Sequence, residues 1–378
     1  MSITHFSFSN HSENWHLKQV DLDNFNLLVG ISGVGKTKIL HALEFVSLVA
    51  TGGDYKLNGE TWTIGFSTNG EQYEWKFESA LIKSNIPYIY GTKVPTIASE
   101  QIIKKSGDKT TILLKRSATE FQLNNNNIPI FEKQDCAINL LSKIESIKPI
   151  YQIFQKFIFS DILQEKHFGT RINPQEPNLT EASEPIEQFK EQSTKLPTIV
   201  KAYRLQQRYS EEFTKIKNLF TKIFGSVEDI KIEISKNNGG VYEYVFKLKE
   251  KTSPKWIAQW EMSAGMFRTI IHLTEISLAP KDSVIIIDEL ESGLGTNCMP
   301  GLTEFLLSKT SHLQVILTSH HPYIINNIPD KTWKIVKRNG GQVTVTPAHD
   351  ISPIDTTSSL DKFLQLLELP DYKNGIAN

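Results

Sequence analysis

Apolar residues along the chain form short runs and regular alternations that predict both strands and helices. The most apolar short run, residues 284–287, consists of four β-branched residues between a polar segment and two acids, Asp288 and Glu289. Such a run is typical of a strand buried on both faces, in the middle of a parallel sheet. Residues 25–29 and 313–317 have the same character, and we expect all three strands in one sheet.

Periodicity elsewhere predicts the remaining elements. Alternation predicts strands over residues 3–8 and 15–20, and strand pairs over 62–66/73–77, 110–115/119–123, 230–234/241–248 and 333–337/342–346. Helical spacing predicts helices over residues 39–49, 186–196, 198–224, 270–278, 299–308 and 360–369. Residues 137–147 and 151–163 have mixed periodicity, and the proline-containing segment 168–185 is the least structured internal stretch. This mixture indicates an α/β fold with a mixed sheet and an antiparallel β subdomain.

Composition narrows the class of protein. With 378 residues and 39% apolar composition, the chain is long enough for about two domains. Its formal charge of −1 gives no bulk attraction to a polyanion. Cys136 and Cys298 are too few and too distant for a disulfide framework or a metal cluster. The sequence shows neither a signal peptide nor an apolar run of about 18 residues, so we expect a cytoplasmic protein with no membrane partner.

A glycine-rich loop follows the predicted strand over residues 25–29. Residues 30–37, the glycine loop, read GISGVGKT and fit G-x-x-x-x-G-K-[ST] at every fixed position. Glycines let the backbone aim its N–H groups at phosphate oxygens, and the following helix adds its positive dipole end. The lysine supplies a charge for the β and γ phosphates, and the next hydroxyl is a ligand for Mg²⁺. We expect nucleotide contacts from Gly30, Ser32, Gly33, Val34, Gly35, Lys36, Thr37 and Lys38.

Two other predicted strands end in polar residues that suit a nucleotide site. Asp288 and Glu289 follow the strand over residues 284–287, and the strand over 313–317 leads to His320 and His321. Open α/β sheets bind ligands at the carboxyl ends of their strands, so we expect these side chains at the same edge as the glycine loop. An imidazole can donate to a γ-phosphate oxygen, and His320 is preferred over His321 for this role.

A further candidate is the start of the predicted helix before residue 278. Residues 263–265 read SAG, and a Ser-x-Gly helix start offers a hydroxyl and free N–H groups to an anion. Serine also caps many helices that bind no ligand, so Ser263 and Gly265 gain meaning only from the other segments.

Four segments follow one another along the chain: the glycine loop, the Ser-x-Gly helix start, the strand ending in Asp-Glu and the strand ending in His. Together, in this order, they resemble the ABC-type ATPase heads of the SMC, RecF and OLD class. The resemblance covers residues 1–50 and 225–340 and looks closest to stand-alone ATPases of bacterial antiphage defence and abortive infection. It implies a P-loop NTPase fold of ABC-head type. The nucleotide-binding core would be split between residues 1–54 and 226–348, with 55–225 as an inserted β-hairpin and helical region and 349–378 as a terminal helix and tail.

The resemblance also implies roles within one copy of the chain. Lys36 and the loop amides would hold the phosphates of ATP. Thr37 and Asp288 would hold Mg²⁺, directly or through water. Glu289 would polarise the attacking water, and His320 would contact the γ-phosphate. The chemistry is positioning and charge neutralisation of a phosphoryl transfer.

Other residues would act on a second copy. In this class Ser263 and Gly265 close over the nucleotide held by the partner, so a homodimer formed through ATP is implied. The segment 291–295 is expected across that interface. The sequence departs from the family pattern in three places: Met262 stands for the usual leucine, the segment after the acids continues as Gly295-Thr296, and no Mg²⁺-sensing glutamine is evident, with Gln134 and Gln152 as candidates. Trp15 is the candidate for stacking on adenine.

A local basic excess leaves a nucleic-acid partner open. Residues 81–116 contain two acids and seven basic residues, which are Lys83, Lys93, Lys104, Lys105, Lys109, Lys115 and Arg116. Such a run fits a DNA or RNA backbone footprint, although a solvated face is the commoner explanation.

Three functions are compatible with these features. The first is an ATP-driven dimeric switch in antiphage defence that controls an effector through residues 55–225. The second is a RecF-like DNA-binding ATPase of repair or recombination, and the third is a nucleotide-gated scaffold with negligible turnover. Only 58 residues follow His320, so we expect an effector of nuclease or toxin type to be a separate chain.

Overall fold

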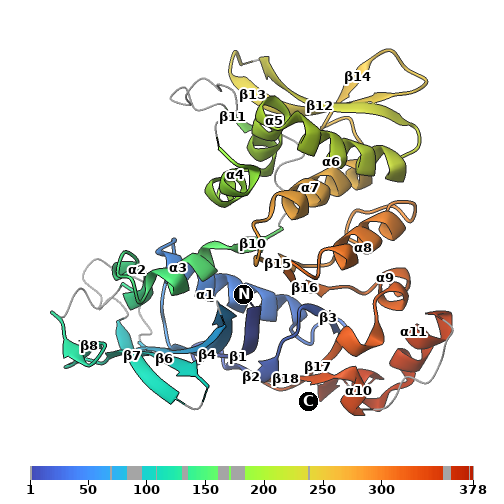
Figure 1. Ribbon diagram of the computed structural model, residues 1–378. Helices are drawn as coiled ribbons and strands as arrows, with labels where there is room; N and C mark the ends of the chain where they lie inside the picture. The colour runs from blue at the N-terminus through green and yellow to red at the C-terminus, as the bar shows by residue number, and fades with distance from the viewer. Residues whose placement is uncertain are drawn as a thin grey trace. The chain divides into compact units, whose positions relative to one another are not determined.

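The computed structural model describes residues 2–68, 70–82, 96–107, 109–129, 135–160, 170–171, 184–236, 239–351, 359–373 and 375–377 (Figure 1). The chain forms two compact units. The core unit comprises residues 1–157, 282–286 and 314–378, and the helical unit comprises 158–281 and 287–313. The domain division expected from the sequence stays a prediction.

A large mixed sheet organises the core unit, with fifteen strands among the described residues. Its order is β10-β15-β16-β3-β17-β18-β2-β1-β4-β5-β6-β7-β8-β9, and β19 pairs with β17. The strands are β1 (Ser2–Asn10), β2 (Trp15–Asp21), β3 (Phe25–Val29), β4 (Glu60–Thr68), β5 (Glu71–Ser79), β6 (Ile97–Ser106), β7 (Lys109–Arg116), β8 (Phe121–Leu123), β9 (Asn126–Asn127), β10 (Phe157–Phe159), β15 (Val284–Ile287), β16 (Gln314–Thr318), β17 (Trp333–Asn339), β18 (Gln342–Pro347) and β19 (Ile376–Ala377). This confirms the α/β class with a mixed sheet.

The three predicted buried strands lie together in this sheet. All residues of β3, β15 and β16 are buried, and β3 pairs in parallel with β16 on one side and β17 on the other. The backbone N–H of Gln314, which begins β16, donates to the carbonyl of Ser283 just before β15, at 2.9 Å. Since the starts of β15 and β16 are joined, both strands run in the same direction. The carboxyl ends of β3 and β16 therefore share one edge of the sheet.

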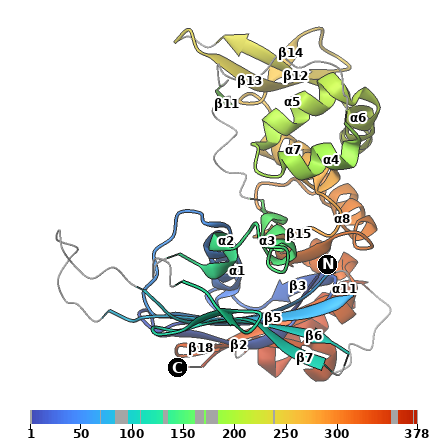
Figure 2. The same ribbon diagram turned by 60° about the vertical axis from the view of Figure 1, so that its left-hand side comes forward.

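Three helices pack on one face of this sheet. Figures 1 and 2 show α1 (Lys36–Thr51), α2 (Ala137–Leu140) and α3 (Lys148–Gln155) on one side of it. The Ser47 hydroxyl on α1 donates to the Phe154 carbonyl on α3 at 3.0 Å. The mixed periodicity of residues 151–163 has a simple cause, because α3 ends at Gln155 and β10 follows almost at once.

The antiparallel end of the sheet holds two elements that the sequence did not predict, β6 and the two-residue strand β9. The hairpin of β4 and β5 is confirmed, and Trp62 stacks on Phe77 with ring centroids 3.9 Å apart. Strands β7 and β8 are also confirmed, but β6 was missed. Its alternation is hidden because a charged residue, Glu100, occupies an inward position and is buried.

The helical unit contains a small antiparallel sheet and five helices among its described residues. The strands are β11 (Thr170–Arg171), β12 (Val227–Lys236), β13 (Tyr242–Glu250) and β14 (Trp256–Ala258). The helices are α4 (Ile186–Ser193), α5 (Thr198–Arg208), α6 (Ser210–Ile223), α7 (Ala264–Leu278) and α8 (Met299–Ser308). Figure 1 shows α5 and α6 between this sheet and α7. Most of the predicted unstructured segment 168–185 lies outside the described residues.

The single helix predicted over residues 198–224 is wrong. The chain breaks at Tyr209, where φ is −135° and ψ is 60°, and α6 begins at the next residue. The Tyr209 hydroxyl donates to the Glu184 carbonyl at 2.9 Å, and its ring lies 5.1 Å from that of Phe189. The apolar stripe continues across the break, so periodicity alone could not locate it.

The remaining elements complete the core unit. The hairpin of β17 and β18 is confirmed, as is a helix near residues 360–369, seen as α11 (Ser359–Glu368). Short elements that were not predicted are α9 (Pro322–Asn327), the 3-10 turn Asp330–Thr332, α10 (Ala348–Ile351), α12 (Pro370–Lys373) and β19. Among the described helices, none has both the length and the apolar character needed to cross a membrane.

Candidate nucleotide-binding site

The glycine loop joins a fully buried strand of the sheet to the first helix. Strand β3 ends at Val29, and α1 begins at Lys36 directly after Gly35, with no side-chain cap. The Gly35 backbone has φ of 103°, a left-handed conformation that favours glycine. A glycine loop that leads into a helix N-terminus brings backbone N–H groups and the positive end of the helix dipole together, so the loop and α1 suit an anion.

The loop rests directly on strand β17. A Cβ on Gly30 would stand 2.7 Å from the Val336 carbonyl oxygen, a distance that real Cβ atoms do not reach. Glycine is therefore required there by close approach of two backbones. The Val34 side chain is fully buried, so this predicted contact residue can offer a ligand only its backbone.

The Lys36 ammonium group lies inside the loop. Its Nζ donates to the carbonyl oxygens of Gly30 at 2.8 Å and Ile31 at 3.1 Å, and the residue is 7% exposed. These bonds place a positive charge at the centre of the loop, where a phosphate oxygen is its natural counter-ion. Thr37 is exposed on the first turn of α1, and Ser32 is exposed on the loop.

Two predicted contact residues have other partners. Lys38 turns its Nζ to the Glu13 carboxylate at 3.0 Å, and both side chains are more than half exposed. Trp15 is 4% exposed and packs its ring 5.9 Å from that of Phe8. The Trp15 indole is thus a core residue beneath the loop, and its ring has no exposed face for an adenine. Gln152 is exposed on α3, and Gln134 lies outside the described residues.

The histidines follow β16 at the sheet edge from which the glycine loop leaves. His320 is partly exposed, two residues after the end of β16. His321 instead begins α9, and its Nδ1 accepts the Tyr323 N–H at 3.2 Å. His321 therefore has a capping role, and the γ-phosphate contact of His320 stays a prediction.

The acid pair, Asp288 and Glu289, follows β15, and both residues belong to the helical unit. Asp288 is partly exposed and Glu289 is exposed. The Glu289 backbone has φ of 45°, which is uncommon outside glycine and is often found at functional sites. Its carbonyl accepts the Ser292 N–H at 2.7 Å and the Arg268 guanidinium at 3.4 Å. Arg268 was missed by the sequence, since the helix was recognised from its apolar residues alone.

The start of α7 contacts the segment that follows the acids. Ser263 caps α7 by accepting the Met266 N–H at 3.1 Å, and it is exposed. Gly265 is buried, and a Cβ there would stand 3.0 Å from the backbone nitrogen of Gly295. Gly295, noted in the sequence as a departure from the family pattern, also packs against Asn297, whose Oδ1 is 2.6 Å from its Cβ position. Both glycines therefore serve close packing between α7 and residues 293–297.

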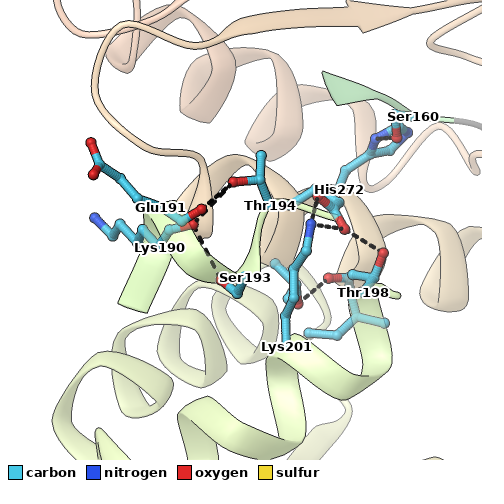
Figure 3. A network of polar contacts seen from close by, with 11 residues as sticks. Ser160, Lys190, Glu191, Ser193, Thr194, Thr198, Lys201 and His272 are labelled. Carbon is cyan, nitrogen blue, oxygen red and sulfur yellow. Dashed lines mark hydrogen bonds and ion pairs between the residues drawn. The ribbon is translucent and has the colours of Figure 1, made fainter. Parts of the chain in front are cut away.

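Buried polar contacts fix α7 to α5 (Figure 3). The Glu275 carboxylate on α7 accepts Lys201 Nζ at 2.8 and 3.1 Å and also the Thr198 hydroxyl, both from α5. The side chains of Lys201 and Glu275 are 5% and 9% exposed. Sequence reasoning missed this ion pair because its members lie far apart in the chain and interrupt apolar stripes without a motif.

One turn before Glu275, α7 carries a buried histidine. His272 Nδ1 lies 3.2 Å from the Ser160 hydroxyl (Figure 3). Burial, reinforced by the Arg268 guanidinium, lowers the pKa of His272 to about 3. The imidazole is therefore neutral near pH 7, and α7 gains no charge from it.

The predicted basic footprint is largely paired with acids. Lys104 contacts Glu71 at 3.1 Å, Lys105 contacts Glu74 at 3.6 Å and Lys115 contacts Glu120 at 2.9 Å. Arg116 is buried 3.8 Å from Glu100. Lys83 and Lys93 lie outside the described residues. Pairing across neighbouring strands reduces the field that a nucleic acid would meet, and a DNA or RNA partner stays a prediction.

The chemistry of the two predicted metal ligands, Thr37 and Asp288, suits magnesium. An exposed hydroxyl at Thr37 and a partly exposed carboxylate at Asp288 are hard oxygen donors. Mg²⁺ is usually bound through one or two such groups together with phosphate oxygens and water. The donor set therefore fits Mg²⁺ better than a metal that prefers nitrogen or sulfur.

Comparison with known proteins gives a family and a fold. The family model described as "AAA domain, putative AbiEii toxin, Type IV TA system" matches residues 25–326. No curated protein matches the chain. Among solved structures, an SMC head bound to the C-terminal winged-helix domain of ScpA is similar, with a TM-score of 0.50 and 12% identity over 93% of this chain and 100% of that one.

Two further SMC heads are similar. The head domain from Pyrococcus furiosus, bound to the C-terminal domain of ScpA, has a TM-score of 0.49 and 11% identity, covering 97% of this chain and 98% of that one. The head domain from Thermotoga maritima has a TM-score of 0.42 and 11% identity, covering 92% and 99%. At these identities a likeness concerns the fold alone.

Proposed function

Because the chain belongs to the AAA-domain family of AbiEii type and has the mixed α/β fold of SMC-head ATPases, we propose that it is an Mg-ATP-dependent ATPase that dimerises on ATP and switches an effector protein. The observation that carries the proposal is the position of Lys36, whose ammonium group is held inside a loop that leads into an uncapped helix start. This is the arrangement that binds the β and γ phosphates of a nucleotide.

Within one copy, each residue acts by position and charge. The loop amides and Lys36 hold the phosphates, and His320 donates to the γ-phosphate. Glu289, which is exposed and has a left-handed backbone conformation, orients the attacking water. Thr37 and Asp288 hold Mg²⁺, which neutralises phosphate charge when bound.

Between copies, the start of α7 closes the site. Ser263 is exposed at a helix N-terminus, and its hydroxyl and the nearby N–H groups face the nucleotide on the second copy. Arg268 links this helix to the Glu289 backbone, so closure over one nucleotide is joined to the position of the acid that serves the other.

The switch acts through the helices of the helical unit. The buried pair of Lys201 and Glu275 makes α5 and α7 move together, so a protein that binds α4 to α6 can alter the position of Ser263. The role is antiphage defence, and the effector is a separate nuclease or toxin. The family description places the matched AAA domain in a type IV toxin–antitoxin system, which supports the defence role.

The ATPase and the dimer are tested together. Glu289→Gln should lower the turnover number about 10²-fold or more, because general-base assistance is lost, while ATP binding is kept. In that background, ATP should convert the protein to a dimer in light scattering, and Ser263→Arg should abolish the dimer. Glu304→Gln and Ser311→Arg, at exposed sites on and after α8, are the matched controls. Nucleotide binding without turnover in the native protein would favour a scaffold.

The defence role needs a separate measurement. Phage should form fewer plaques on cells that carry the gene with its genomic neighbours than on cells that carry the Lys36→Ala version. Equal plaque counts would contradict the defence role and leave the ATPase proposal to the biochemical assay.

A further inference from the structure

Strand β17 extends beyond the point where the glycine loop leaves the sheet. Its residues Trp333 to Ile335 pair with Leu27 to Val29 of β3, and Lys334 to Asn339 pair with β18 on the other edge. After Val29 the chain turns away, so the last residues of β17 lose β3 as a neighbour. Strand β19 takes that edge, with Arg338 opposite Ile376 and Asn339 opposite Ala377. The Arg338 N–H donates to the Gly375 carbonyl at 2.7 Å.

This placement puts β19 against the back of the glycine loop. The Cβ position of Gly375 lies 3.1 Å from Ile31 Cγ1 and 3.3 Å from Val34 Cγ1. The Ile376 Cδ1 atom lies 3.6 Å from the Cβ position of Gly33. Ile31, Gly33 and Val34 are thus contacted by a segment more than 330 positions later in the chain.

A side chain of β17 reinforces the contact. The Arg338 guanidinium donates through its Nη1 to the Gly33 carbonyl at 3.4 Å and through its Nε to Gly340 at 2.7 Å. Arg338, Gly375 and Ile376, here called the loop clasp, therefore hold a carbonyl and two apolar side chains of the loop from outside. A loop held in this way keeps its N–H groups in one orientation.

We propose that the loop clasp positions the glycine loop for nucleotide binding, an inference that rests on the proposed function of that loop. The loop is also held at its ends by β3 and α1 and at Gly30 and Ile31 by Lys36, and the loop clasp adds support from outside at Gly33 and Val34. Preorganisation raises affinity because less conformational entropy is lost on binding. The clasp residues are positioning residues, since they act on the ligand through the loop backbone.

The test uses Ile376→Asp, which places a carboxylate against Gly33, and Ile144→Asp as matched control. Both isoleucines are 43% exposed and both belong to the core unit, but Ile144 follows α2 and is not part of the loop clasp. Hydrogen–deuterium exchange of residues 30–37 in protein without nucleotide should become faster only in Ile376→Asp. The same variant should bind Mg-ADP about tenfold more weakly, with a higher KM for ATP and an unchanged kcat at saturation.

Three outcomes separate the possibilities. Faster loop exchange without loss of ADP affinity overturns the proposal, and so does unchanged exchange. Ile376→Val, which keeps an apolar side chain, should show the loop exchange and the Mg-ADP affinity of the native protein. Arg338→Gln provides a second variant if Ile376→Asp fails to fold. If the native protein binds no Mg-ADP, the proposed function fails in the native chain, and loop exchange still decides whether the clasp holds the loop.

Discussion

The glycine loop of the core unit and helix α7 of the helical unit are held in place by different means. The loop is fixed by backbone groups: Lys36 bonds two loop carbonyls, and Gly30 lies against the Val336 carbonyl. Helix α7 is fixed by side-chain charges buried among apolar residues, chiefly the pair of Glu275 and Lys201. The loop should therefore be sensitive to added volume, whereas α7 should be sensitive to changes of charge.

The largest expected effect comes from splitting the buried ion pair. Glu275→Leu leaves the Lys201 ammonium buried with no carboxylate, which should lower the free energy of unfolding by about 3–5 kcal/mol. The double variant Lys201→Met/Glu275→Leu should recover most of the loss, since two apolar residues can replace a buried pair. Urea unfolding followed by circular dichroism measures both.

The control for this comparison is an exposed pair in the same unit. Lys215 and Glu212 form an ion pair on α6, with side chains 68% and 38% exposed. Lys215→Met should change stability by less than about 1 kcal/mol, because exposed pairs are screened by solvent. A similar loss in Lys215→Met and Glu275→Leu would contradict the importance of burial at α7.

The second effect concerns two glycines with opposite consequences. Gly30→Ala forces a methyl group against a β17 carbonyl and should weaken Mg-ADP binding by about tenfold or more. Gly265→Ala crowds the Gly295 backbone nitrogen and should leave ADP affinity intact while weakening the ATP-dependent dimer by about tenfold. Isothermal titration and analytical ultracentrifugation measure the two properties.

Gly225→Ala serves as control for both glycine variants. A Cβ there meets nothing within 4 Å. Identical losses in Gly30→Ala and Gly265→Ala, in either measurement, would erase the distinction between the loop and the helix start.

The smallest effect is a pH dependence at α7. The pKa of His272 is about 3 in the folded chain, against an ordinary value of 6.5. Above pH 6.5 the His272 imidazole is neutral in both the folded and the unfolded chain, so it does not change the free energy of unfolding there. As pH falls from 6.5 toward 3 the unfolded chain takes up the proton first, so stability should fall by at most about 1.4 kcal/mol per pH unit.

His272→Phe removes the titrating group and tests this dependence. Its melting temperature should decline less between pH 7 and pH 5 than that of the native protein. A parallel decline in both proteins would assign the acid sensitivity to other groups, such as the paired carboxylates of the β4 to β7 strands.

Local pattern was sufficient for much of the fold. Short runs of mostly apolar residues predicted β3, β15 and β16, because a strand buried on both faces has few polar side chains. The glycine loop was predicted because its requirements are all local: a strand, a tight turn, a lysine and a helix start. The break at Tyr209 and strand β6 were missed, since a continued apolar stripe hides one and a buried Glu100 hides the other.

The sequence by itself identified the candidate phosphate contacts: the glycine loop, the capping Ser263, and the polar residues that follow β15 and β16. These candidates depend on the chemical type and the spacing of a few residues, which a short segment of the sequence specifies by itself. Tertiary structure alone decided what supports them. The β19 strand behind Gly33, the Arg268 contact with the Glu289 backbone and the Lys201–Glu275 pair join segments that are distant in the chain. Such contacts follow from the register and packing of whole elements, and no local periodicity encodes them.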